Sequence, residues 1–256
     1  MDPATLIGFT ISIVALVVFM ILEGADPMSL IFLPAIVLVV IATFGAAAAS
    51  QTMDDLKKVG NWFKMAVLPA KVPAPTEQIQ TLVSLAEKAR KEGLLALEAQ
   101  VKAIEDPFLK RGLQMGIDGT DPEELRAVLE SEIAAKKAED KVAAKFFNAM
   151  GGYAPTIGIL GCIVGLMNVM GNLDRPETLG PMVSAAFIAT LWGVLAANFW
   201  FLPMGAKILR VSELQAAQME LLVEGITEIQ AGTSPRAVRL KLNSLVPPSA
   251  LAKEAA

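Results

Sequence analysis

Two kinds of reactive side chain are scarce in this 256-residue chain, which has no histidine and a single cysteine. Without histidine, no side chain has an ordinary pKa near neutral pH, so a histidine-based pH switch is excluded. The lone Cys162 can form neither an internal disulfide nor a cysteine metal cluster. The sequence therefore indicates no metal, no cofactor and no redox chemistry.

Charge is missing from four long apolar stretches. Residues 5–22, 28–49, 152–173 and 179–206 contain no Asp, Glu, Lys, Arg or His. At about 1.5 Å rise per residue, each stretch can cross a hydrocarbon core of about 30 Å as a helix. Solid apolar runs differ from the alternating pattern of a membrane barrel, and 54% hydrophobic residues argue against a soluble enzyme. Proteins that move ions usually keep an ionisable group inside the bilayer, so a partner must supply one if this chain conducts ions.

Basic residues predict the orientation in the membrane. Of the 22 Lys and Arg residues, 15 lie between the second and third stretches and six in the C-terminal tail, whereas the two short connections hold only Arg175. The positive-inside rule then places both termini and the middle segment in the cytoplasm. The first stretch is expected to be a retained helix, because no basic residue precedes it and a second span follows at once.

The predicted fold is an all-α integral membrane protein with four transmembrane helices in two hairpins and a helical cytoplasmic domain between spans two and three. Its segments are 1–49 for the first hairpin, 50–146 for the cytoplasmic domain, 147–206 for the second hairpin and 207–256 for a cytoplasmic helix and tail.

Three cytoplasmic helices are expected. Apolar residues at steps of three or four predict one helix with one apolar face over residues 76–104. Asp121 and Pro122 read as the N-cap and first residue of a helix that continues through Lys145 towards the membrane. A last helix over about 207–230 is expected to end at Gly232.

Small residues mark the third span. Gly158, Gly161 and Gly165 can bring helix backbones close together, and helix packing is the ordinary use of intramembrane glycine. Pro155 in the same span and Pro203 near the cytoplasmic end of the fourth permit kinks, which are either simply tolerated or mark a point of mechanical transmission.

Two further features carry alternative readings. The Thr190 hydroxyl in the fourth span either bonds back to the carbonyl one turn earlier or helps to solvate an ion or a carboxylate on a neighbouring helix. In the cytoplasmic helix, Arg90, Lys91 and Glu98 belong to a mixed-charge surface. Such a surface is either an ordinary solvated face or a binding surface for a partner of complementary charge.

These residues in combination resemble the MotA/PomA A-subunits of bacterial flagellar stators. The likeness covers nearly the whole chain in six ordered blocks: ARKEGLLALE (89–98), QMGIDG (114–119), YAPTIG (153–158), AFIATLWG (186–193), ANFWFLP (197–203), and EGI (224–226) through PR (235–236). The chain departs from the family at Ala25, at Ala42-Thr43 and at Trp192, where glycines and a tyrosine are common, so peripheral helix packing is the property in doubt.

The resemblance implies a multi-pass subunit of the bacterial cytoplasmic membrane that turns ion flow into torque. Five copies would surround two copies of a single-span B-subunit, which brings a membrane Asp and a peptidoglycan-binding domain. By the same likeness Arg90 and Glu98 match rotor-binding positions, with Lys91 a weaker candidate. Pro155 and Pro203 match coupling prolines, and Thr190 matches a hydroxyl that lines the ion path.

The resemblance also bears on the ion. Sodium-type relatives tend to carry a hydroxyl where this chain has Cys162, and a thiol is a poorer ligand for Na⁺. Protons are therefore the favoured ion. Membrane lipid, the B-subunit and a flagellar rotor ring protein are the expected partners, and nucleic acid is not.

Two rival functions fit the sequence less well. An ExbB/TolQ-type energiser would power a non-flagellar envelope process, but those relatives typically have three spans and an external N-terminus. A self-contained transporter or membrane enzyme lacks support, because the spans carry no charge and the chain has no phosphate loop, metal cluster or nucleophile-base arrangement.

Overall fold

The computed structural model describes residues 2–70 and 72–248. Every regular element in those ranges is a helix, so the all-α prediction is confirmed. Met1, Lys71 and the last eight residues of the predicted C-terminal segment lie outside the described residues.

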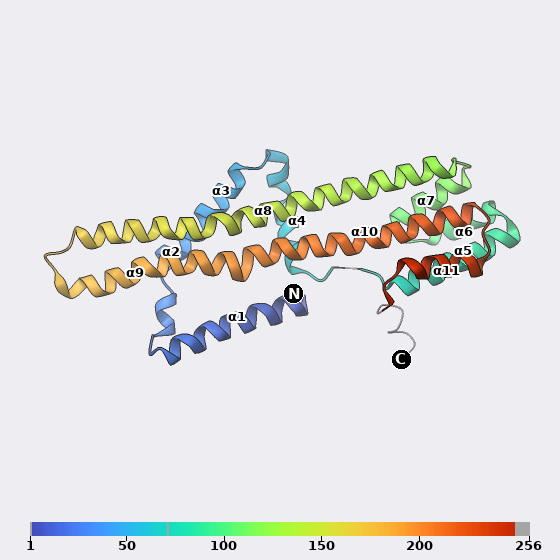
Figure 1. Ribbon diagram of the computed structural model, residues 1–256. Coiled ribbons are helices and arrows are strands. Elements are labelled where there is room, and N and C mark those ends of the chain that lie inside the picture. The colour runs from blue at the N-terminus through green and yellow to red at the C-terminus, as the bar shows by residue number, and fades with distance from the viewer. Residues whose placement is uncertain (1, 71, 249–256) are drawn as a thin grey trace. The chain divides into compact units, whose positions relative to one another are not determined.

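Figure 1 shows the helices in chain order. Four elements are short 3₁₀ or π-helical segments, labelled η, and the others are α-helices. The elements are α1 (Pro3–Leu22), η1 (Pro27–Leu30), α2 (Leu33–Val37), η2 (Leu38–Ala42), α3 (Thr43–Ala49), α4 (Met53–Val67), α5 (Pro75–Glu92), η3 (Leu94–Leu97), α6 (Glu98–Ala103), α7 (Pro107–Ile117), α8 (Pro122–Met170), α9 (Pro176–Leu195), η4 (Ala196–Phe201), α10 (Leu202–Gln230) and α11 (Pro235–Leu245).

Three helices of the described chain are long and apolar enough to cross a membrane: α1, α8 and the continuous helix Pro176–Gln230 formed by α9, η4 and α10. The second apolar stretch, expected to be helical over 28–49, is a shorter helix that begins only at Leu33. Pro34 explains the late start, because proline restricts the residue before it and has no N–H to donate. The number of spans stays a prediction.

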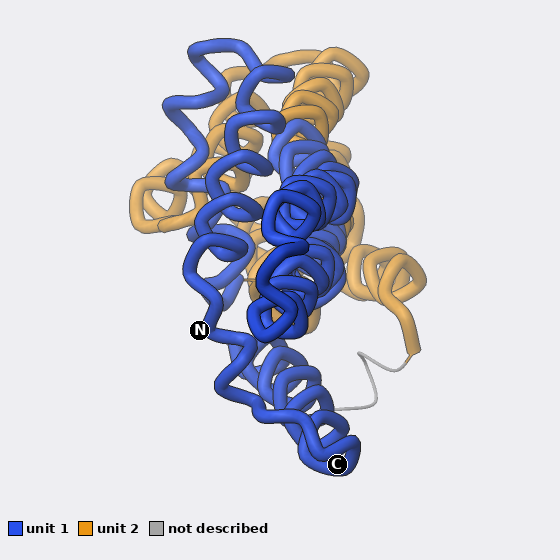
Figure 2. The backbone as a smooth tube through the Cα atoms, turned by 90° about the vertical axis from the view of Figure 1, so that its left-hand side faces the viewer, with its two compact units in different colours: residues 1–70, 140–210 blue, residues 71–139, 211–256 orange. Residues whose placement is uncertain are grey.

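The chain divides into two compact units, coloured separately in Figure 2. Unit 1 comprises residues 1–70 and 140–210, and unit 2 comprises residues 71–139 and 211–256. The long helices α8 and α10 each contribute to both units. The predicted boundaries between hairpins and cytoplasmic segments stay predictions.

Aromatic rings build much of the core of unit 1. Phe146 and Phe147 on α8 are fully buried. Trp62 and Phe63 on α4 pack against them with ring centroids 5.5 Å and 5.0 Å away, respectively. Phe44 on α3 adds an edge-to-face contact with Phe146 at 5.9 Å. Such pairs contribute about 0.5–1.5 kcal/mol each beyond their buried area, so α3 and α4 are fixed to α8.

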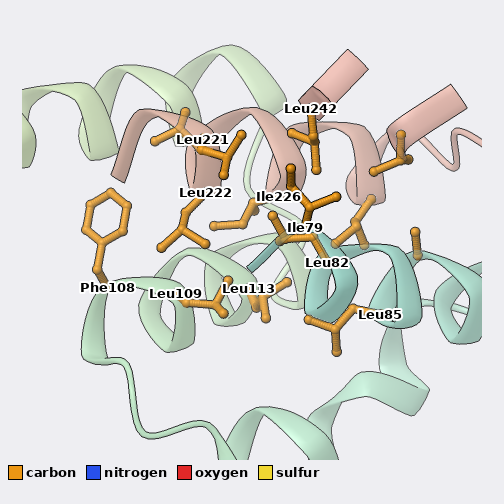
Figure 3. Packing of buried hydrophobic residues seen from close by; sticks show 14 of the residues in the cluster. Ile79, Leu82, Leu85, Phe108, Leu109, Leu113, Leu221, Leu222, Ile226 and Leu242 are labelled. Atoms are coloured by element: carbon orange, nitrogen blue, oxygen red, sulfur yellow. The ribbon is translucent and has the colours of Figure 1, made fainter. Parts of the chain in front are cut away.

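Aliphatic side chains build the core of unit 2. Figure 3 shows them gathering in one cluster from α5, α7, α10 and α11, with these labelled members: Ile79, Leu82, Leu85, Phe108, Leu109, Leu113, Leu221, Leu222, Ile226 and Leu242. The apolar face that the sequence predicts for α5 is therefore buried against three other helices.

The predicted single helix over 76–104 is wrong. Helix α5 ends at Glu92, and Gly93 has φ 84° and ψ 164°, a conformation that essentially only glycine adopts. The chain then continues through η3 and the separate helix α6. Arg90 and Glu98 consequently lie on two different helices.

Two predicted helix ends are confirmed. The Asp121 side chain accepts a hydrogen bond from the N–H of Glu123 at 2.9 Å, and α8 begins at Pro122. Helix α10 ends at Gln230, and Gly232 has φ 70°. Both ends were readable because capping residues act locally.

Candidate ion path and rotor surface

Helices α8 and α9 approach each other along a row of small residues, which we call the glycine seam: Gly158, Gly161, Gly165, Ala186, Ala189 and Gly193. A Cβ built on Gly158 would lie 2.8 Å from the Ala189 carbonyl oxygen, and one on Gly193 would lie 2.5 Å from the Ala154 carbonyl oxygen. Neither position can hold a side chain without separating the two helices.

The other two predicted packing glycines extend the seam. A Cβ on Gly165 would lie 2.7 Å from that of Ala186. A Cβ on Gly161 would lie 2.9 Å from that of Ala189 and 2.7 Å from Leu38 Cδ2 on η2. Gly161 thus faces both α9 and the second apolar helix.

Thr190 lies on α9 opposite Gly158. Its hydroxyl donates across the helix pair to the Gly158 carbonyl at 3.4 Å. The alternative expectation, a bond to the carbonyl one turn earlier on its own helix, is not the arrangement found. The long distance indicates a weak bond, so this hydroxyl can exchange its partner at little cost.

The two predicted coupling prolines have different surroundings. Helix α8 continues through Pro155, which lies half-buried one turn before Gly158. Pro203 is exposed and follows the π-helical segment η4, where the N–H of Leu202 donates to the Ala197 carbonyl five residues earlier. Pro203 has no N–H to donate, and π-helical segments are often found at functional sites.

Cys162 is a free, half-buried thiol that follows Gly161 on α8. In the described part of the chain, no group of three or more His, Cys, Asp or Glu side chains could hold a metal ion.

The three predicted rotor-binding residues lie around the break at Gly93. Arg90 and Lys91 are exposed in the last turn of α5. Glu98 is exposed in the first turn of α6 and lies 3.6 Å from Lys102 on the same helix. Leu95, which lies between Lys91 and Glu98 in the sequence, has 73% of its surface exposed. Leu95 is not among the residues predicted from the sequence, because in an unbroken helix it is one more residue beside an apolar face.

A charged cluster fixes α11 to α8 and α10 within unit 2. Arg126 donates to Glu224 at 2.7 Å, and Lys241 contacts both Glu224 and Glu228. Burial of Glu224 opposes ionisation, but its hydrogen bonds with Lys241 and Arg126 outweigh this effect and hold its pKa below the ordinary value. The bond from Lys241 likewise lowers the pKa of Glu228. These carboxylates are therefore structural anions at neutral pH.

The fold and the site together define a helical membrane subunit. Its helices α8 and α9 pack closely, and its four apolar stretches carry no charged side chain. Residues 100–221 match the model of the MotA/TolQ/ExbB proton channel family. Motility protein A of Bacillus subtilis is 34% identical over 247 residues, which cover 96% of this chain and 92% of that protein. Chemotaxis protein PomA of Vibrio alginolyticus is 30% identical over 242 residues, which cover 93% and 92%.

Two solved structures are similar over nearly their full length. The flagellar MotAB stator complex from Bacillus subtilis matches with a TM-score of 0.91 and 33% identity, covering 98% of both chains. The C. jejuni MotAB structure matches with a TM-score of 0.92 and 29% identity, covering 97% of both. The chain belongs to the motility protein A family, the A-subunits of bacterial flagellar stators. These full-length similarities are to flagellar motility proteins and MotAB stators, which favours the stator over the ExbB/TolQ alternative.

Proposed function

We propose that this chain is the ring-forming subunit of a rotary flagellar stator in the bacterial cytoplasmic membrane, with both termini in the cytoplasm. Five copies surround two copies of a single-span B-subunit that carries a membrane Asp and a peptidoglycan-binding domain. The main support is that the four apolar stretches hold no ionisable group, so the titrating carboxylate must come from a partner. The similar structures from Bacillus subtilis and C. jejuni are MotAB complexes, which agrees with such a partner.

The glycine seam packs α8 against α9, and the half-buried Thr190 beside it lies on the surface that the B-subunit Asp meets. When the Asp binds or releases an ion, its charge changes, and so does its preferred position against α8 and α9 of successive A-subunits. Thr190 offers a hydroxyl there that is only weakly engaged at 3.4 Å. Each elementary charge that crosses the membrane releases about 2.3 kcal/mol per 100 mV, so each ion supplies a modest step of rotation.

Pro155 and Pro203 pass this step from the membrane helices to the cytoplasmic ones. Helix α10 continues from η4 and Pro203 down to Gln230, so movement at Pro203 displaces a long helix. Arg90 and Glu98, with Lys91 beside them, then transmit the step to the rotor ring protein by electrostatic contact. Opposite charges on both sides of Leu95 set register and encounter rate more than affinity.

The transported ion is the proton. Cys162 supports this choice, since a thiol is a poor ligand for Na⁺ and the described spans offer no carboxylate oxygen for it. Swimming speed measured against external sodium at fixed pH tests the choice, and a sodium requirement would overturn it.

Charge reversal tests the rotor assignment. The double variant Arg90→Glu/Glu98→Arg should abolish motility in a strain without its own stator, while the complex still assembles in the membrane. The matched control reverses the exposed pair Asp54 and Lys57, which lies on α4 with side chains 86% and 73% exposed, and should swim normally. Normal swimming of the first variant would refute the rotor role of its two residues.

A further inference from the structure

Asp2 joins three elements of unit 1 at the start of α1. Its Oδ1 accepts a hydrogen bond from the Ala4 N–H at 2.9 Å and so caps α1. Its Oδ2 lies 3.1 Å from Nζ of Lys207 on α10. Its own N–H donates to the carbonyl of Val67, the last residue of α4, at 3.0 Å. One residue therefore connects α1, α4 and α10.

Lys207 completes this junction. Its Nζ also donates to the Thr5 hydroxyl at 2.6 Å, so two residues of the first α1 turn hold the same ammonium. The side chains of Lys207 and Asp2 are only 18% and 24% exposed. A partly buried pair with additional hydrogen bonds is screened less by salt than a surface pair.

The rest of α1 gives the junction its importance. Met20 is the only residue of α1 that is buried within this chain, so side-chain packing inside the subunit holds the helix weakly. A cavity of about 370 Å³ lies between α1 and α10, and Thr5, Phe9, Pro203 and Lys207 are among the residues that line it. The contact between Asp2 and Lys207 joins α1 to α10 where side-chain packing between the two helices is incomplete.

The position of Lys207 relates the junction to Pro203. The two residues are four apart on α10, so they lie one turn apart on the same helix face. Any displacement of α10 at Pro203 acts first on the turn that carries Lys207.

We propose that Asp2 is a positioning residue for torque transmission. Through Lys207, Asp2 holds the start of α1 against the turn of α10 that follows Pro203. When α10 moves at Pro203, this contact keeps α1 and α10 together, so the cavity between them does not widen. This role rests on the proposed coupling function of Pro203. It goes beyond that function by assigning a part to a polar residue at the N-terminal end of the first span.

The decisive variant is Asp2→Asn, because the amide oxygen can still accept the Ala4 N–H while the negative charge is lost. The variant replaces the wild-type chain in its own bacterium, beside the native B-subunit and rotor, and the rotation of a loaded bead is followed as stators join the motor one by one. The height of each speed step reports torque per stator, and the number of steps reports assembly.

We expect Asp2→Asn to lower the step height and to leave the number of steps unchanged. Lys207→Met should lower it similarly, and the two changes together should cost no more than either alone, because the residues act as a pair. Lys207→Arg should keep most of the torque. Asp54→Asn, which breaks the exposed pair with Lys57, is the matched control and should retain the wild-type step height.

Three results would overturn the positioning role. These are a wild-type step height in Asp2→Asn, fewer steps of unchanged height, and strictly additive losses in the double variant. The second result would mean that Asp2 serves assembly alone. Failure of the wild-type chain to restore rotation would instead count against the proposed function itself.

Discussion

Helix α8 packs tightly against α9 at Gly158, and a single added methyl group tests whether this close contact holds the two helices together. In Gly158→Ala the new Cβ would lie 2.8 Å from the Ala189 carbonyl oxygen, 3.1 Å from Gly193 Cα and 3.2 Å from Thr190 Cα. All three atoms belong to the α9 backbone, so no side-chain rotation relieves the contact. Ordinary carbon–oxygen contacts are about 3.3–3.6 Å, so α9 must move by about 0.5 Å or more.

The energetic cost follows from this displacement. Overpacking of a close contact costs about 1–3 kcal/mol. Moving α9 outward also weakens the contact between Gly165 and Ala186, since a gap of about 0.5–1 Å forfeits a quarter to a half of the dispersion energy. Alanine has a higher helix propensity than glycine, which offsets up to about 1 kcal/mol of this cost. The expected net loss is therefore about 1–2 kcal/mol.

Thermal unfolding of the purified A-subunit in detergent measures this loss. At about 2–4 °C per kcal/mol, Gly158→Ala should melt about 2–8 °C below the wild type. Gly152→Ala is the matched control in the same helix, because nothing lies within 4 Å of a Cβ there. It should melt at or above the wild-type temperature. Equal melting of the two variants would refute the close-packing argument.

Three further predictions concern caps, charges and a hydrogen bond. Asp121→Ala should lower the unfolding free energy by about 1 kcal/mol through loss of the α8 N-cap, with Asp121→Asn close to wild type in the same denaturation assay. The lowered pKa of Glu224 contributes stability that is complete above the ordinary carboxyl pKa of 4.5 and is lost as pH falls through the lowered value. Lys241→Met should shift that loss to higher pH in unfolding curves, and an unchanged pH profile would contradict the assignment. Trp192→Phe removes the 2.7 Å bond from the indole N–H to the Leu30 carbonyl and should cost about 1 kcal/mol; an unchanged melting temperature would show that the bond is not needed.

Local signals in the sequence were enough for several helix ends. Asp121 and Pro122 predict the start of α8, and Gly232 predicts the end of α10, because caps involve residues within one turn of each other. The apolar face of α5 was also predictable, since its spacing follows the helical period. Membrane class followed from composition alone.

The helix break at Gly93 could not be predicted from the periodicity of the apolar residues. Apolar residues continue at steps of three or four through Leu94, Leu97 and Val101, so the pattern reads as one helix. Leu97 and Val101 are indeed buried, but η3 and α6 carry them and not α5. The same core can receive side chains from two short helices, and only the backbone conformation of Gly93 distinguishes the two arrangements.

Partners across the fold were the least predictable part of the site. The glycines at 158, 161 and 165 indicate close packing by their spacing, but no local rule names Ala186, Ala189 and Gly193 as the residues opposite them. The sequence did not predict a role for Asp2, since its partner Lys207 lies more than two hundred residues away in the sequence. Long-range pairs of this kind require the fold.

The break at Gly93 also determines how the rotor test must be judged. Arg90 and Lys91 lie in the last turn of α5 and Glu98 in the first turn of α6, so each charge lies where the helix macrodipole favours it. Reversing Arg90 and Glu98 therefore costs about 0.3–1 kcal/mol at each helix end, in addition to any loss of rotor contact. That cost is small beside a typical unfolding free energy of about 5–15 kcal/mol, so the double variant should still fold. Because neither side chain is part of the buried core, lost motility with intact assembly can be assigned to the rotor surface and not to unfolding.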